Sequence, residues 1–99
     1  MINIYDTNND FIIECDDIAN NIQNIKTDTD NLLKTYPDHK IIFDLSKTNF
    51  LDNACIGLFL YYKAYIINAP DTAKKILALT NYPSKRIITK ERMKQTSKI

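Results

Sequence analysis

Tryptophan is absent from this 99-residue chain, glycine occurs once, and cysteine and histidine are scarce. The single glycine, Gly57, excludes the glycine-rich loops that cradle phosphates in nucleotide-binding folds. Cys15 and Cys55 are too few and too far apart for a disulfide framework, which favours a reducing, cytoplasmic compartment. With one histidine, His39, no spacing typical of a metal site or a Ser–His–Asp triad occurs. We therefore expect no cofactor, no metal and no catalytic residue.

Excess charge and long apolar runs are also lacking. The formal net charge is +1, and no aromatic residue that could stack on a base follows Tyr82 in the basic segment 84–99. The longest apolar run, 54–62, is well short of the roughly 18 residues that span a membrane. The first residues lack the basic and apolar regions of a signal peptide. We expect neither a nucleic-acid partner nor membrane insertion.

The pattern of apolar residues predicts one α/β domain over residues 1–99. The expected elements are strands at 2–5 and 11–15, a helix at 18–36, a strand at 40–45, a helix at 53–68, a strand at 75–80 and a basic helix at 84–99. Turn-forming residues at 7–10 join the first two strands as a hairpin. The order ββαβαβα predicts a mixed, mostly parallel sheet with an N-terminal antiparallel hairpin and helices packed on it.

Polar residues predict where the helices begin and end. Asp16 or Asp17 can cap the first helix, and Pro37 lies just beyond its end, as a stop signal should. Residues 27–30 interrupt the apolar spacing and can restart that helix with a new cap. Asp52 can cap the second helix by accepting a backbone N–H.

Two segments resemble the STAS domain, the anti-sigma-factor-antagonist family. Strand 41–46 ends in Asp-Leu-Ser, and residues 50–58 (Phe-Leu-Asp-Asn-Ala-Cys-Ile-Gly-Leu) stand where that family has an aromatic or aliphatic residue and then Asp-Ser-Ser-Gly-Leu-Gly. Residues 76–84 are similar to its next strand and Asn-Pro-Ser-like turn. The resemblance covers residues 11–97 in element order, and it implies a STAS-like domain that regulates by binding a protein.

The chain departs from the family's motif at its centre. In the regulatory branch the second Ser is phosphorylated, but this chain has Ala54 there, after Asn53 and before Cys55. We expect no phosphorylation at that position. A second branch, the small STAS subunit of bacterial phospholipid-transport ABC complexes, has Asp-Thr and small residues, and Asp52-Asn53-Ala54 is at least as close to that pattern. The resemblance thus implies either an anti-sigma kinase-like partner or an ABC ATPase.

The helix after Asp52 has two apolar stripes, and only one need face the sheet. Gly57 suggests that the stripe 58, 61, 62 and 65 goes inward through close helix–sheet approach, while Lys63 suggests that the stripe 56, 59, 60 and 67 faces outward as an interaction surface. Alternatively, flanking segments cover both stripes. Formation of a weak homodimer is a further alternative. The predicted partner-binding residues are Asn49, Phe50, Asp52, Asn53, Ala54, Cys55, Ile56, Phe59, Leu60 and Lys63.

Two further side chains have a functional and a structural interpretation. Cys55 falls in the first helical turn, where a thiolate is stabilised, although most such cysteines are small buried hydrophobes. A small thiol-dependent enzyme is therefore the weaker alternative. His39 is interpreted as a solvated loop residue. The leading hypothesis is a non-catalytic regulatory module that binds a protein.

Overall fold

The fold is a five-stranded sheet with three α-helices, seen here in a computed structural model that describes residues 1–88. The elements are β1 (Ile2–Asp6), β2 (Asp10–Cys15), α1 (Ile22–Thr35), β3 (Lys40–Asp44), α2 (Asn53–Tyr61), β4 (Tyr65–Ile67), α3 (Asp71–Leu79), the 3₁₀-helix η1 (Ser84–Arg86) and β5 (Ile87–Ile88). The strands lie in the order β1-β2-β3-β4-β5. β1 is antiparallel to β2, and every later neighbour is parallel.

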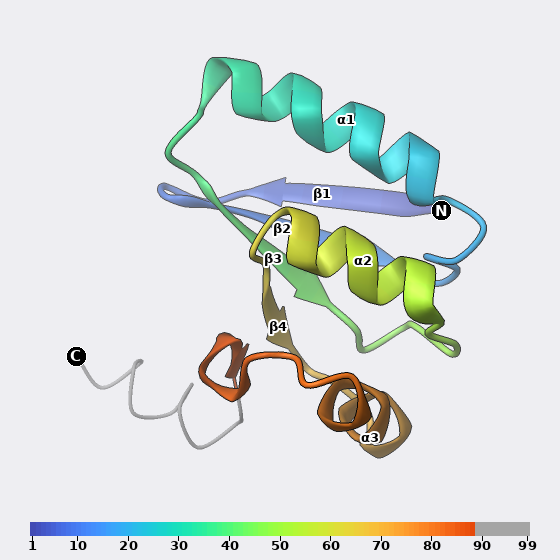
Figure 1. Cartoon of the computed structure of the whole chain (residues 1–99). Helices are drawn as coiled ribbons and strands as arrows, with labels where there is room; N and C mark the ends of the chain where they lie inside the picture. Colours follow the sequence, from blue (N-terminus) through green and yellow to red (C-terminus); the bar gives the residue numbers. More distant parts are fainter. Residues whose placement is uncertain (89–99) are drawn as a thin grey trace.

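One face of the sheet forms the core. Alternate residues of the strands are buried there, because successive side chains of a strand point to opposite faces. The buried strand residues are Phe11, Ile13, Cys15, Ile41, Phe43 and Ile66. α1 and α2 run side by side on the sheet, and α3 lies beyond β4 (Figure 1). All three helices contribute to one hydrophobic cluster.

The predicted class is confirmed: the sheet is mixed and mostly parallel, begins with an antiparallel hairpin, and follows the order ββαβαβα through its first seven elements. Two of those elements are nevertheless made by other residues than predicted. The predicted helix 53–68 ends at Tyr61, and its last residues form β4. The predicted strand 75–80 belongs almost entirely to α3.

α2 ends where Lys63 takes the left-handed conformation, with φ 51°. The amide of Lys63 then donates to the carbonyl of Leu60 at 3.1 Å, and that of Ala64 donates to the carbonyl of Phe59 at 2.9 Å. This pair of bonds is the Schellman motif, which usually has glycine at the left-handed position. Because lysine stands there instead, the sequence carries no stop signal, and the predicted helix runs on.

α3 ends in the same way, with a residue that tolerates this conformation better. Asn81 has φ 58°, and the amide of Tyr82 donates to the carbonyl of Leu77 at 2.9 Å. Ala73 and Leu77 are buried four residues apart on one helix face, whereas Leu79 is 83% exposed. An apolar run of leucine and alanine suits a helix better than a strand, which explains the wrong prediction for 75–80.

The remaining boundaries also shift. α1 begins at Ile22 rather than after Asp16 or Asp17, and it continues through residues 27–30. Asp17 stabilises the preceding turn by accepting from the amide of Asn20. At the other end, 84–88 form η1 and β5 instead of a helix. The rest of the predicted basic helix, residues 89–99, lies outside the described part of the chain.

Candidate functional site

The loop after β3 holds α2 in place. Leu45 is buried, and its amide donates to the carbonyl of Ile67 at 3.0 Å. The buried hydroxyl of Thr48 donates to the carbonyl of Cys15 at 2.8 Å. These bonds tie the loop to β2 and β4, so its next residues emerge from a fixed base. Asn49 is exposed, and Phe50 is 63% exposed, an unusual placement for a large aromatic residue.

Asp52 caps α2, as predicted. Its Oδ1 accepts from the amide of Cys55 at 2.9 Å. This bond favours the ionised carboxylate and lowers the pKa of Asp52 below its usual range. The cap fixes the direction of α2 relative to the loop.

The predicted outward stripe of α2 is wrong at its centre. Phe59 is fully buried and Ile56 is 4% exposed, while Leu60 and Lys63 are exposed as expected. The aromatic stripe does not go inward as a whole either, because Tyr61 is 61% exposed although Leu58 is buried. The ring of Phe59 instead packs 4.6 Å from that of Phe43 in β3, centroid to centroid.

The exposed face of α2 is made of other residues and carries no charge. Asn53, Ala54, Gly57, Leu60 and Tyr61 all face solvent and follow one another at helical spacing. A surface helix ordinarily exposes charged or polar residues, but no charged residue occurs anywhere in α2. These five residues form what we call the α2 face, while the exposed Phe50 lines a small pocket beside α3.

Gly57 lies in the middle of the α2 face and makes no close contact. Among residues 1–88, a Cβ built there meets no atom within 4 Å apart from its chain neighbours and its own helix backbone, and its φ is not positive. The expected close helix–sheet approach is therefore wrong. Because glycine inside a helix costs roughly 0.5–1 kcal/mol relative to alanine, the fold gains nothing from it.

Gly57→Ala is thus expected to raise the free energy of unfolding by about 0.5–1 kcal/mol. Urea titration followed by circular dichroism measures this change. Ala54→Gly, at an exposed site on the same helix, should lower stability by a comparable amount. A destabilised Gly57→Ala protein would reveal a hidden contact at this position.

Cys55 lies inside the core, not at the surface. Its side chain is fully buried, and burial raises the pKa of the thiol to about 11. A reactive cysteine needs the opposite, an accessible thiolate with a lowered pKa. This environment supports a packing role for Cys55.

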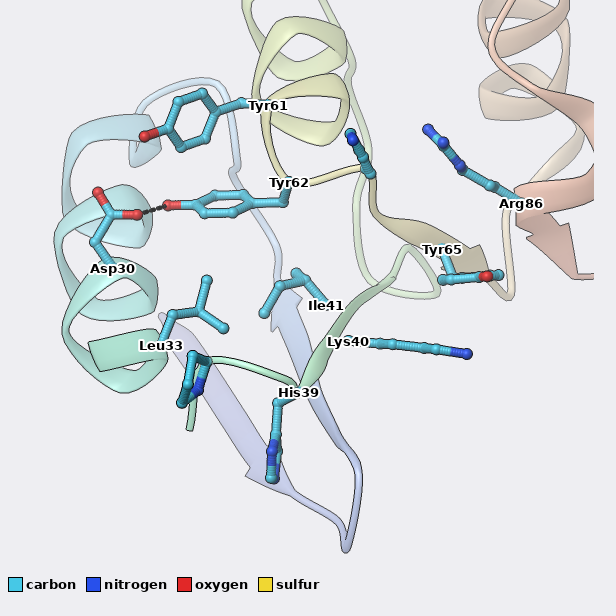
Figure 2. Close-up of a pocket in the computed structure, with 11 residues that line it drawn as sticks. Asp30, Leu33, His39, Lys40, Ile41, Tyr61, Tyr62, Tyr65 and Arg86 are labelled. Carbon is cyan, nitrogen blue, oxygen red and sulfur yellow. Dashed lines mark hydrogen bonds between the residues drawn. The ribbon is translucent and has the colours of Figure 1, made fainter. Parts of the chain in front are cut away.

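A second surface feature is a groove of about 710 Å³ at the other end of the sheet (Figure 2). It lies where β3 and β4 begin and where α1 and α2 end. Its lining residues are Asp30, Leu33, Pro37, His39, Lys40, Ile41, Tyr61, Tyr62, Lys63, Tyr65 and Arg86. Tyr61 and the end of α2 belong to both surfaces.

The two sides of the groove differ in character. Figure 2 shows Lys40, Tyr65 and Arg86 on one side and the aromatic and aliphatic side chains of α1 and α2 on the other. The hydroxyl of Tyr62 donates to Asp30 at 2.6 Å and lies 3.2 Å from the carbonyl oxygen of Lys26. Burial, and then the carboxylate of Asp30, raise the pKa of Tyr62 above its usual range. The side chain of Tyr62 is therefore held in one position and forms part of the groove lining between α1 and α2.

His39 closes one end of the groove and is not the solvated residue that we predicted. Its side chain is only 15% exposed. The ring lies 4.5 Å from that of Phe11 and 5.0 Å from that of Tyr36, and its Nε2 lies 3.2 Å from Oδ1 of Asp6. These contacts connect the end of α1 to the β1–β2 hairpin.

Of the ten predicted site residues, three are buried and the others reach the surface. Cys55, Ile56 and Phe59 are in the core, whereas Asp52 is half-buried and the remaining six are exposed. Apart from Lys63, the residues of the groove, Tyr61 included, were not among the predicted site residues. The groove residues come from four separate segments, so no local motif could have revealed them.

A comparison of the chain with protein-family models and with curated proteins finds no match. Within residues 1–88 no group of three or more His, Cys, Asp or Glu side chains could hold a metal ion. No helix of the described segment is long and apolar enough to cross a membrane.

Proposed function

We propose that this chain is a non-catalytic protein-binding module and that its contact surface is the α2 face. One observation carries the proposal: α2 has no charged residue, yet one of its faces is open to solvent. Exposed contiguous apolar surface of this kind is typical of protein interfaces. The cost of Gly57 supports the same conclusion, because within residues 1–88 a Cβ at this position would meet nothing beyond its chain neighbours and its own helix backbone.

The shape of the α2 face favours an apolar helix of the partner as its occupant. Ala54 and Gly57 are small and exposed, and the larger Leu60 and Tyr61 follow them on the same side of α2. Small residues at such positions let the ridge of another helix pack closely against α2. The absence of charge on the face favours a partner segment that is uncharged where it meets Gly57.

The STAS resemblance suggests the class of protein to which such a partner belongs. It favours an anti-sigma kinase-like protein, with the ATPase of a lipid-transport ABC complex as the second candidate. Ala54 has no hydroxyl, so binding is not gated by phosphorylation there. Among the hydroxyl residues of the preceding loop, Thr48 is buried while Ser46 is exposed. A relocated switch in this loop would therefore use Ser46.

Ala54→Arg is expected to weaken partner binding by at least about 30-fold, the equivalent of about 2 kcal/mol. The arginine would place a charge in the centre of an uncharged contact. The partner is first identified by a photo-crosslinking amino acid at Leu60, in the native cell, and is then purified for titration. Ala78→Arg, on the exposed side of α3, serves as the matched control and should bind normally.

Three outcomes would contradict the proposal. A crosslinker at Leu79, which is 83% exposed on α3, could capture the same protein as efficiently. Ala54→Arg could bind the purified partner as tightly as the original chain. Finally, the captured protein could be a second copy of this chain. The α2 face would then be the interface of a homodimer and not a site for a different protein.

A further inference from the structure

We propose that the groove between α1, α2, β4 and η1 binds a small organic phosphate. The phosphate would lie at the cationic side, near Lys40, Lys63 and Arg86, and an apolar or ring-shaped body would lie against Ile41, Leu33 and the tyrosines. The groove's volume of about 710 Å³ falls within the usual range of small-molecule sites. This proposal does not rest on the protein-binding role of the α2 face, although Tyr61 belongs to both surfaces.

The first observation that supports a phosphate ligand is the positive charge of the groove. Three cationic side chains line one cavity, and within residues 1–88 none of them forms an ion pair with a carboxylate. The one carboxylate of the lining, Asp30, accepts from Tyr62 and lies 3.5 Å from the ammonium group of Lys26. Asp30 is therefore already compensated and offsets none of the three cations.

A multiply charged anion suits this arrangement better than a simple carboxylate. A phosphate monoester carries nearly two negative charges at neutral pH. Arginine binds phosphate in a two-pronged geometry, and lysine binds it as a point charge. Figure 2 shows Arg86 and Lys40 on either side of Tyr65, and the ammonium group of Lys40 lies over the Tyr65 ring, 5.4 Å from its centroid.

The second observation is the apolar side of the groove, which suits the body of an organic ligand. Ile41 is buried, Leu33 is half-buried, and the ring of Tyr61 is largely exposed. The rings of Tyr61 and Tyr62 meet edge to face at 4.9 Å, so Tyr61 is held in place. Figure 2 shows the ring of Tyr62 between Tyr61 and the aliphatic side chains of Leu33 and Ile41. Rings and aliphatic side chains together favour a flat or apolar ligand body.

The backbone at Lys63 is the third observation. Residues 63, 68 and 81 have positive φ, and the other two are asparagines, which tolerate that conformation. Lysine is strained there, and glycine would relieve the strain. Strained positions that persist tend to cluster at binding sites. A ligand contact of the Lys63 ammonium group would give this strained residue a role at the site.

The test uses phenyl phosphate as the probe, titrated into the full chain and followed by NMR chemical shifts. We expect it to bind at least about tenfold more tightly than either inorganic phosphate or phenol, since head and body each contribute. Arg86→Gln should weaken phenyl phosphate binding about tenfold or more. Lys74→Gln, which removes an exposed lysine of α3 outside the groove, should leave it unchanged.

Lys63→Gly separates binding from folding. This variant should bind the probe more weakly while its melting temperature rises by a few degrees, so unfolding cannot explain the loss. The proposal is overturned if phenyl phosphate binds no better than inorganic phosphate, or if Lys74→Gln weakens binding as much as Arg86→Gln does. If a phosphotyrosine peptide binds at least tenfold more tightly than phenyl phosphate, the ligand of the groove is a phosphorylated protein and not a small molecule.

Discussion

Phe59→Ala is expected to lower the free energy of unfolding by about 3–5 kcal/mol, the usual loss for a large aromatic residue in a core. The side chain of Phe59 is fully buried. Its ring lies 4.6 Å from that of Phe43 on the sheet and 6.4 Å from that of Tyr82, which follows α3. Truncation would leave a cavity where α2, β3 and the segment after α3 meet. Partner binding should fall only in proportion to the unfolded fraction.

Leu60→Ala is the matched control, because the neighbouring side chain is 47% exposed. It should cost about 1 kcal/mol or less, yet it should weaken partner binding directly. Chemical denaturation of both variants, followed by circular dichroism, measures the two losses. Comparable losses for Phe59→Ala and Leu60→Ala would contradict the burial described above. This pair therefore tests which side of α2 is the core and which side is the contact surface.

The parts of the fold that sequence predicts well are those with local physical causes. The hairpin follows from a polar turn at 7–10 between two apolar strands. The central strand follows from the apolar run that begins at Ile41. Asp52 caps α2 because a carboxylate placed before the first turn reaches an unpaired amide. Each of these features depends on a few neighbouring residues, and the structure contains all of them.

The wrong predictions fall where tertiary contacts, rather than neighbouring residues, determine the secondary structure. No residue near Lys63 signals the end of α2, since the left-handed position that normally holds glycine holds lysine. The leucine and alanine residues of the run 76–79 suit a helix better than a strand, but the periodicity of a short apolar run cannot by itself assign the element. Its burial on one side, through Leu77, is what selects the helix.

The candidate site could be located by sequence but not oriented. The position of α2 was correct near its start, and Phe50, Asn53 and Ala54 are at the surface as expected. The helix is apolar around its circumference, however, so its pattern contains no information about which face is buried. Gly57 suggested an inward face through close packing, but it faces solvent. Only contacts with β3 and the segment after α3 resolve the orientation.

A steep loss of stability at alkaline pH is the other large effect that we expect. Burial raises the pKa of the Cys55 thiol from 9.0 to about 11 and the pKa of the Tyr82 hydroxyl from 10.0 to about 12. Tyr82 is 4% exposed, and its hydroxyl donates to the carbonyl of Ala64. Both groups hold their proton more tightly in the folded chain than in the unfolded chain. Their contribution to stability is therefore complete below pH 9 and is lost as pH rises through the folded values.

The size of this loss follows from linkage. Each group shifts by about two pKa units, and one unit corresponds to about 1.4 kcal/mol, so the two together remove roughly 5 kcal/mol by pH 12. That amount rivals the entire stability of many small domains. Urea denaturation at intervals between pH 8 and pH 11 measures the slope. Cys55→Ala should delay its onset from about pH 9 to about pH 10, whereas Tyr61→Phe, at a largely exposed ring, should leave the slope unchanged.

Alkylation of Cys55 supplies an independent measurement of the same burial. In the folded chain at pH 8, iodoacetamide should react with Cys55 far more slowly than in urea, because the buried thiol stays protonated and is shielded. The rate should increase at the pH where the denaturation midpoint falls, since unfolding exposes the thiol. Rapid alkylation of folded chain at neutral pH, together with a flat stability profile up to pH 11, would show an accessible thiolate. That result would favour the thiol-dependent enzyme over the binding module.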